Sequence, residues 1–98
     1  MDARIESYKE TSVKDIKIED YKISIIGTVI KREGNSFILD DGAGQILVIS
    51  NDAPNADYVR VFGRVVPYEN GFELEADIIQ DLSKVDRELL RKVRDLFK

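Results

Sequence analysis

Five segments of the chain have the hydrophobic spacing of short β-strands, and the last of them shows it most clearly. Between Phe72 and Ile79, apolar residues at Phe72, Leu74, Ala76 and Ile78 alternate with acidic residues. A period of two sends alternate side chains to opposite faces, so this pattern predicts a strand with one buried and one wet face. The other predicted strands are Tyr21 to Lys31, Ser36 to Asp40, Gln45 to Ser50 and Asp57 to Val66.

Turn-forming residues separate these strands. Residues 32–35 and 41–44 predict tight turns, residues 51–56 a connector without a full helix, and residues 67–71 a loop that carries Tyr68. Gly27 and Gly63 interrupt two of the strands, which usually indicates a bulge or a sharp bend. A long bent first strand followed by four short ones predicts an all-β fold, a five-stranded Greek-key barrel.

The C-terminal residues have a helical pattern instead. Ser83 is a candidate N-cap, Asp86 follows in the first turn, and basic residues gather toward the end, where they complement the helix macrodipole. One apolar stripe recurs at helical spacing: Leu82, Val85, Leu89, Leu90, Val93, Leu96 and Phe97. A small barrel has little room for seven apolar side chains, so we expect part of the stripe to bind a partner. The alternative is that the stripe covers the open end of its own barrel.

The chain therefore divides into three parts. Residues 1–19 form a lead-in packed on the barrel, residues 20–82 the barrel, and residues 83–98 the amphipathic helix. Within the lead-in, Val13, Ile16 and Ile18 stand among charged residues, which predicts a short extended or turn segment docked on the barrel.

Composition excludes several classes of protein. No apolar run approaches the ~20 residues of a bilayer crossing, and the N-terminal residues lack the apolar stretch of a signal peptide. We therefore expect an intracellular protein without membrane contact, cytoplasmic in a prokaryote or nuclear in a eukaryote. The chain has no Cys and no His, no phosphate-cradling glycine loop and no cluster with metal-ligand spacing. We expect no enzyme activity, no cofactor and no metal.

Charge is unevenly distributed along the chain. Residues 83–98 carry six basic and three acidic side chains, which leaves the remaining residues with a net charge of −7. Proteins that bind nucleic acid through phosphate neutralisation usually have a basic patch. The acidic body therefore argues against strong, sequence-independent DNA binding by the isolated chain.

Two stretches of sequence resemble a known family. Phe37 to Gly44 (FILDDGAG), followed by Ile46-Leu47-Val48, is similar to the strand 2, turn, strand 3 signature of nucleic-acid-binding OB domains. Tyr58 to Val65 (YVRVFGRV), followed by Tyr68, an alternating strand and a helix, resembles the middle subunit of replication protein A and its telomere-complex relatives. The resemblance implies a five-stranded OB-fold barrel with a terminal helix. It also implies single-strand contact through strands 2 and 3 and the 1–2 and 4–5 loops, and partner subunits bound through the helix.

The resemblance makes Tyr68 the best candidate for stacking on a base. Candidate phosphate contacts are Arg64, Arg60, Lys31 and Arg32. Arg60 and Arg64 share a strand face by their spacing, and pairing with Glu73 or Glu75 is an equally good interpretation of them. Tyr68 has an alternative as well, in which its ring packs the loop onto the barrel edge. Phe37, Phe62 and Phe72 are expected in the core or against the N-terminal segment.

These features favour a non-catalytic subunit of a single-stranded-DNA-binding complex, similar to replication protein A and acting in DNA replication and repair. The expected partners are other OB-fold subunits, bound through the C-terminal helix, and single-stranded DNA, bound weakly by the isolated chain. Two alternatives remain open: an OB-fold interaction scaffold without nucleic-acid contact, and a tRNA-binding OB domain.

Overall fold

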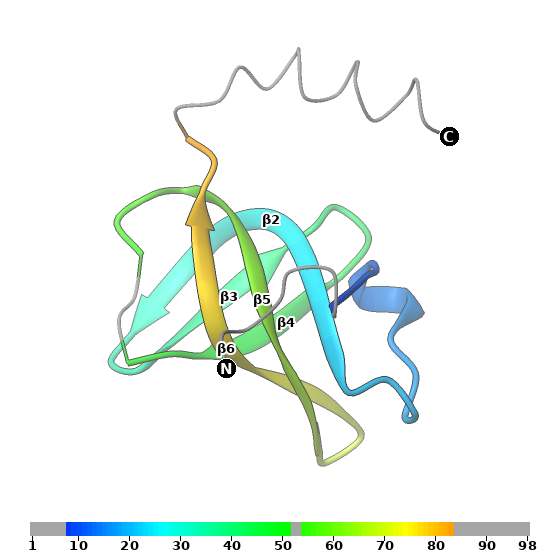
Figure 1. Ribbon diagram of the computed structural model, residues 1–98. Helices are drawn as coiled ribbons and strands as arrows, with labels where there is room; N and C mark the ends of the chain where they lie inside the picture. Colours follow the sequence, from blue (N-terminus) through cyan, green and yellow to red (C-terminus); the bar gives the residue numbers. More distant parts are fainter. Residues whose placement is uncertain (1–7, 52–53, 84–98) are drawn as a thin grey trace, which may run out of the picture.

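The described strands form one sheet that curves round and closes on itself (Figure 1). The computed structural model describes residues 8–51 and 54–83. Within them the elements are β1 (Lys9–Glu10), the 3₁₀ turn η2 (Val13–Asp15), β2 (Lys22–Glu33), β3 (Ser36–Asp40), β4 (Gln45–Ile49), β5 (Tyr58–Tyr68) and β6 (Gly71–Asp81). Among the described residues, no helix has the length and hydrophobicity to cross a bilayer.

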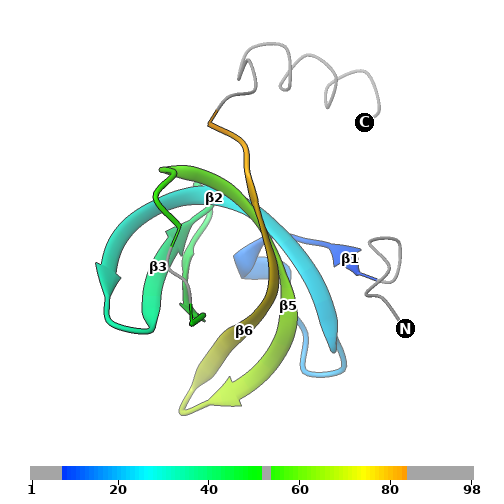
Figure 2. The same cartoon turned by 60° about the vertical axis from the view of Figure 1, so that its left-hand side comes forward.

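Strand β2 closes the barrel because it pairs with two different strands along its length. Its first part pairs antiparallel with β5, from Lys22 to Thr28, and its second part with β3, from Thr28 to Glu33. The order continues through β4 to β6, which run parallel, and returns to β5. Figure 2 shows β5 and β6 side by side. This five-strand arrangement is an OB-fold barrel, as the sequence predicted. The predicted helix over residues 83–98 lies outside the described residues except for Ser83.

A glycine marks the place where β2 passes from one partner to the other. A Cβ at Gly27 would stand 2.6 Å from the carbonyl oxygen of Asp40 and 3.1 Å from Cγ of Leu39. Gly63 has the same position on β5, facing the carbonyl of Glu75. Both glycines point into the barrel, so the absent side chains allow neighbouring strands to approach at the bends. The ladder between β2 and β3 is irregular at Ile30, and the ladder between β5 and β6 is irregular at Asp77, which bulges opposite the step from Phe62 to Gly63.

Inward residues from all five barrel strands make the core. It includes Phe37, Leu39, Val48 and Leu74, each 1% exposed or less. From the N-terminal segment, Val13 and Ile16 pack against this core, whereas Ile18 is 78% exposed.

The three phenylalanines have different positions. Phe37 is in the core and Phe72 packs against it. Phe62 faces outward and meets the ring of Tyr8 edge-on, with centroids 5.4 Å apart. Phe62 therefore holds the N-terminal segment on the outside of the barrel.

Two local predictions were wrong. Tyr68 is the last residue of β5 and not part of a loop, because pairing continues past Pro67 to Tyr68 and Gly71, leaving Glu69 and Asn70 as the turn. In β6, Ile79 and not Ile78 packs against the core. The bulge at Asp77 adds one residue to the strand, which reverses the faces of all residues after it.

Replacing Gly27 by Ala is expected to destabilise the barrel by about 1–3 kcal/mol, because the new methyl group would stand 2.6 Å from the carbonyl oxygen of Asp40 and force the backbone to shift. The matched control is Gly71→Ala, where nothing lies within 4 Å of the added atom. Urea unfolding measures both. Equal midpoints for Gly27→Ala and the wild type would show that the close approach of β2 and β3 is not required.

Candidate nucleic-acid interface

The outward side of β3 and β4 forms a half-buried aliphatic surface. Ile38 pairs with Leu47, and Ser36 with Ile49, while the intervening residues point into the core. We call Ile38, Leu47 and Ile49 the β3–β4 face. In OB folds this side of the barrel is the usual location of oligonucleotide contact.

Lys31 and Tyr68 flank this face on opposite sides. One line of paired residues crosses the sheet through Lys31, Ile38, Leu47, Glu73 and Val66. With about 4.8 Å between neighbouring strands, this line measures roughly 19 Å along the curved sheet. Tyr68 stands two residues beyond Val66 at the end of β5. A strand of nucleic acid crossing the face meets a cation on one side and an aromatic ring on the other.

Tyr68 and Lys31 are both accessible. The tyrosine is 55% exposed, so a large part of its side chain is open to solvent. Lys31 is exposed as well, and no hydrogen bond or ion pair joins it to another described residue.

Arg64 forms ion pairs with two carboxylates of β6. Its Nε donates to Oδ1 of Asp77 at 3.1 Å, and its Nη1 lies 3.3 Å from Oε1 of Glu75. The charge of Asp77 raises the pKa of the guanidinium above its ordinary value. Arg64 therefore pairs with carboxylates of the neighbouring strand, which was the alternative interpretation of the sequence. These two ion pairs offset its charge, so Arg64 attracts a phosphate only weakly.

Asp77 also holds the N-terminal segment. The hydroxyl of Tyr8 donates to Oδ2 of Asp77 at 3.0 Å, and burial, with this bond second, raises the pKa of Tyr8. The bulge in β6 thus presents one carboxylate to two partners. Sequence reasoning missed this contact because 69 residues separate Tyr8 from Asp77.

Arg60 lies far from Tyr68 on the same outward side of β5. Its Nη1 donates to Oε1 of Gln80 at 3.4 Å, its guanidinium lies 5.9 Å from the ring centroid of Phe62, and its Nε is buried without a hydrogen-bond partner. Arg60 and Tyr68 are eight residues apart, which is about 26 Å measured along β5. The structure therefore does not bring Arg60 and Tyr68 into one compact site.

Arg32 tethers the connector between β4 and β5. Its guanidinium donates to the carbonyl oxygens of Pro54 and Ala56 at 2.8 and 2.9 Å and pairs with Asp57 at 3.2 Å. These bonds give Arg32 a structural role that the sequence did not suggest. Of the four predicted cations, only Lys31 is left without a partner among the described residues.

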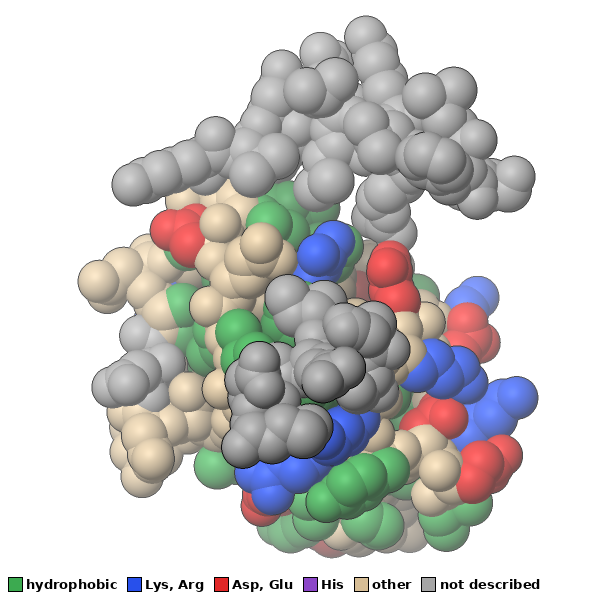
Figure 3. Space-filling model, in the orientation of Figure 1, with side chains coloured by type: hydrophobic (Ala, Val, Ile, Leu, Met, Phe, Trp, Pro, Cys, Tyr) green, Lys and Arg blue, Asp and Glu red, His purple; other side chains and the backbone are tan. Residues whose placement is uncertain are grey.

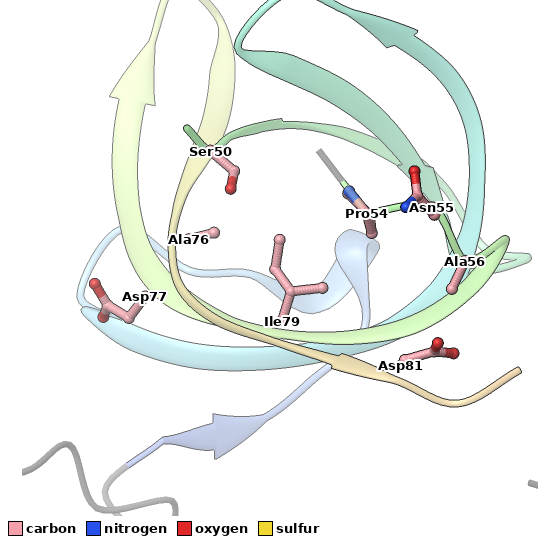
Figure 4. A pocket seen from close by; sticks show the side chains of 8 residues that line it. All are labelled: Ser50, Pro54, Asn55, Ala56, Ala76, Asp77, Ile79 and Asp81. Carbon is pink, nitrogen blue, oxygen red and sulfur yellow. The ribbon is translucent and has the colours of Figure 1, made fainter. Parts of the chain in front are cut away.

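A pocket of about 450 Å³ opens at the end of the barrel beneath this connector (Figure 4). Ser50, Pro54 and Ala56 line one side of it, and Ala76 and Ile79 of β6 line the other. Ile79 is eight residues along β6 from Gly71, the partner of Tyr68. The pocket is therefore separate from the face between Lys31 and Tyr68.

The acidic turn between β3 and β4 is accounted for by its own hydrogen bonds. Oδ1 of Asp41 accepts from the N–H groups of Ala43 and Gly44, and Oδ1 of Asp40 accepts from Gly42. No group of three or more candidate metal ligands occurs within the described ranges.

Of the seven residues predicted to bind a partner, Leu82 alone lies among the described residues. This side chain is 5% exposed and therefore buried in the structure of the single chain. Val85, Leu89, Leu90, Val93, Leu96 and Phe97 lie outside the described residues. Beside Leu82, Oδ1 of Asp81 accepts from both the N–H and the hydroxyl of Ser83, the predicted N-cap.

Comparison with known proteins places the fold. No family model and no curated protein matches the chain. Among solved structures, the chain is similar to the telomere capping protein Ten1 from Saccharomyces pombe, at 14% identity and a TM-score of 0.65, over 92% of this chain and 96% of that one. It is also similar to replication protein A of U. maydis, solved bound to ssDNA, at 21% identity and a TM-score of 0.57, over 76% and 73% of the two chains.

A third similar structure is the hypothetical protein ygiW from E. coli, at 17% identity and a TM-score of 0.58, over 74% of this chain and 87% of that one. The chain therefore has the OB fold, shared with the replication protein A and telomere-capping barrels that its sequence resembles. At these identities the likeness is one of fold.

Replacing Arg64 by Gln is expected to lower the free energy of unfolding by about 1 kcal/mol, because two partly exposed ion pairs are lost. Affinity for an oligonucleotide is expected to change less than twofold, because the Arg64 charge is already neutralised. Urea unfolding and fluorescence anisotropy test the two expectations. A tenfold loss of affinity with unchanged stability would return Arg64 to the binding site.

Proposed function

We propose that this chain is a non-catalytic OB-fold subunit of a complex that binds single-stranded DNA inside the cell, in the cytoplasm of a prokaryote or the nucleus of a eukaryote. The barrel contacts the strand weakly across the β3–β4 face. Residues 83–98 supply assembly with other OB-fold subunits. The observation that carries the proposal is the exposed ring of Tyr68 opposite the unpaired Lys31, on either side of that face.

The chemistry of the face suits weak contact. Stacking on an exposed aromatic ring contributes about 1–3 kcal/mol per base and tolerates any sequence. Ile38, Leu47 and Ile49 offer an apolar surface for sugars and bases, and Lys31 offers one phosphate contact. With Arg64 and Arg32 engaged inside the chain, few phosphates are neutralised, so the dependence of affinity on salt is shallow.

Assembly compensates for this weakness. When weak binding modules are joined, the second contact forms at a high effective concentration, and overall affinity exceeds that of each part. The six apolar residues of the C-terminal stripe beyond Leu82, together with the basic charge of residues 83–98, form the segment that we assign to the partner subunits.

A second candidate function is an OB-fold scaffold that binds only protein. The observation in its favour is the negative charge beside the β3–β4 face, where Glu73 and Glu75 lie. Arg64 forms ion pairs with Glu75 and Asp77. A tRNA-binding domain is a third candidate function. Oligo-dT and oligo-U of equal length, titrated at low and high salt, separate the three functions. Absence of binding to either, by both the chain and its complex, would leave the scaffold.

Replacing Tyr68 by Ala is expected to weaken binding of fluorescein-labelled oligo-dT by about 5- to 100-fold, because one stacking contact is lost. The control is Tyr68→Phe, which keeps the ring and is expected to bind within twofold of the wild type. Because Tyr68 is 55% exposed, urea midpoints should agree among all three proteins. An unaltered isotherm for Tyr68→Ala would remove Tyr68 from the interface.

Replacing Leu89 and Val93 by Asp is expected to abolish co-purification of partner subunits from the native host, because each change puts a charge into the apolar stripe. The barrel should stay folded, with an unchanged urea midpoint. A matched control is Arg91→Asp, which changes charge off the stripe. Loss of folding in the double variant would show that residues 83–98 belong to the core of the barrel.

A further inference from the structure

Exposed apolar side chains gather at one end of the molecule. Four large hydrophobic residues in the described part of the chain are prominently exposed, and three of them are Ile18 at 78%, Tyr21 at 63% and Tyr68 at 55%. They come from the loop before β2 and from the β5–β6 hairpin, which both project toward the lower end of the molecule in Figure 1. Figure 3 shows hydrophobic side chains at that end. We call Ile18, Tyr21 and Tyr68 the tyrosine patch.

The backbone fixes Tyr21 beside β5. The carbonyl oxygen of Tyr21 accepts from the N–H of Val65 at 2.8 Å, and the next residue along, Lys22, is paired with Arg64. Tyr21 therefore stands opposite Val65, three residues from Tyr68. At about 3.3 Å per residue, the backbone positions of the two tyrosines are offset by roughly 10 Å along the strand direction.

The loop that carries Tyr21 is held by its own bonds. Oδ2 of Asp20 accepts from the N–H of Lys17 at 2.9 Å, its Oδ1 accepts from Nζ of Lys9 at 3.3 Å, and the N–H of Asp20 donates to the carbonyl of Lys17 at 3.0 Å. The bond from Lys17 is the largest cause that lowers the pKa of Asp20. Tyr21 is thus presented by an ordered turn, which reduces the entropy lost when a ligand binds.

The residue that follows Tyr21 in the sequence is a lysine. Nζ of Lys22 is 5.5 Å from the ring centroid of Tyr8, and no described carboxylate forms an ion pair with it. An exposed aromatic ring beside a cation is the combination with which proteins hold single strands without reading their sequence.

We propose that Tyr21 is a second stacking ring for single-stranded nucleic acid, and that with Tyr68 it directs the strand from the β3–β4 face toward the start of β2. Lys22 contacts the phosphate beside the base on Tyr21. Backbone positions roughly 10 Å apart correspond to about three stacked-base steps, so the two rings hold bases separated by at most a few positions. This inference rests on the proposed function and extends its binding surface to residues 18–22.

The tyrosines themselves report on the contact. The chain has four tyrosines and no tryptophan, so its intrinsic fluorescence is that of tyrosine. In the wild type, titration of the full chain with unlabelled oligo-dT is expected to quench the emission of each tyrosine that stacks on a base. In Tyr21→Phe, only the stacked tyrosines that remain contribute to the quenching. Anisotropy of labelled oligo-dT gives the affinity in parallel.

Tyr21→Ala is expected to weaken oligo-dT binding by about 5- to 100-fold. When it is combined with Tyr68→Ala, it is expected to remove part of the quenching that the single Tyr68→Ala variant still shows. Tyr21→Phe is expected to bind within twofold of the wild type. The control is Ile30→Ala, an exposed apolar residue at the bulge in β2 and outside the patch, which should bind like the wild type. Urea midpoints verify that every variant is folded.

The outcomes separate this inference from the function on which it rests. Wild-type affinity for Tyr21→Ala, together with weakened binding by Tyr68→Ala, overturns the role of Tyr21 and leaves the proposed function standing. Failure of the wild type to bind oligo-dT at low salt overturns both. If Tyr21→Ala keeps its oligo-dT affinity but loses a partner subunit in co-purification, the patch is a protein interface and the inference is wrong.

Discussion

The structure depends on β2 pairing with two strands in succession, because this strand is shared by the two halves of the barrel. The change of partner occurs at Thr28, beside Gly27, where the carbonyl of Asp40 comes within 2.6 Å of the place a side chain would occupy. Once β2 bends there, β3 and β4 are carried across from β5, and the parallel pairing of β4 with β6 completes the circle. Lys31 and Tyr68 then stand on either side of the β3–β4 face, although 37 positions of sequence separate them.

The distribution of charge follows from the same closure. Because β5 and β6 are paired along their length, Arg64 lies beside Glu75 and Asp77 of β6. These carboxylates neutralise the charge of its guanidinium. Arg32 is likewise used to hold the connector over the pocket end. Because Arg32 and Arg64 form ion pairs within the chain, the barrel has little positive charge available to attract a phosphate backbone. The proposed function therefore relies on stacking, one lysine and the gain from assembly.

Local pattern was sufficient for the strands but not for the contacts between them. The bounds of β3 were predicted from alternation, and those of β4 to within one residue, because each element is short and periodic. The reversal at Ile79 escaped prediction because the bulge at Asp77 depends on pairing with Gly63 rather than on the residues of β6 itself. Tyr68 was taken for a loop residue because Pro67 and Gly71 are turn formers, yet pairing continued through both. The partners of Arg32 and Tyr8 were unpredictable for a similar reason, since they lie 22 and 69 residues away.

The central claim is that single-stranded DNA lies across the face between Lys31 and Tyr68, and amide chemical shifts of the ¹⁵N-labelled chain test it most directly. Addition of oligo-dT at low salt should shift the amides of Lys31, Ile38, Leu47 and Tyr68, and leave unchanged those of Arg60 and Ile78, which lie away from Tyr68 along β5 and β6. Shifts confined to the Arg60 side, or a spectrum that oligo-dT does not alter, would contradict the account.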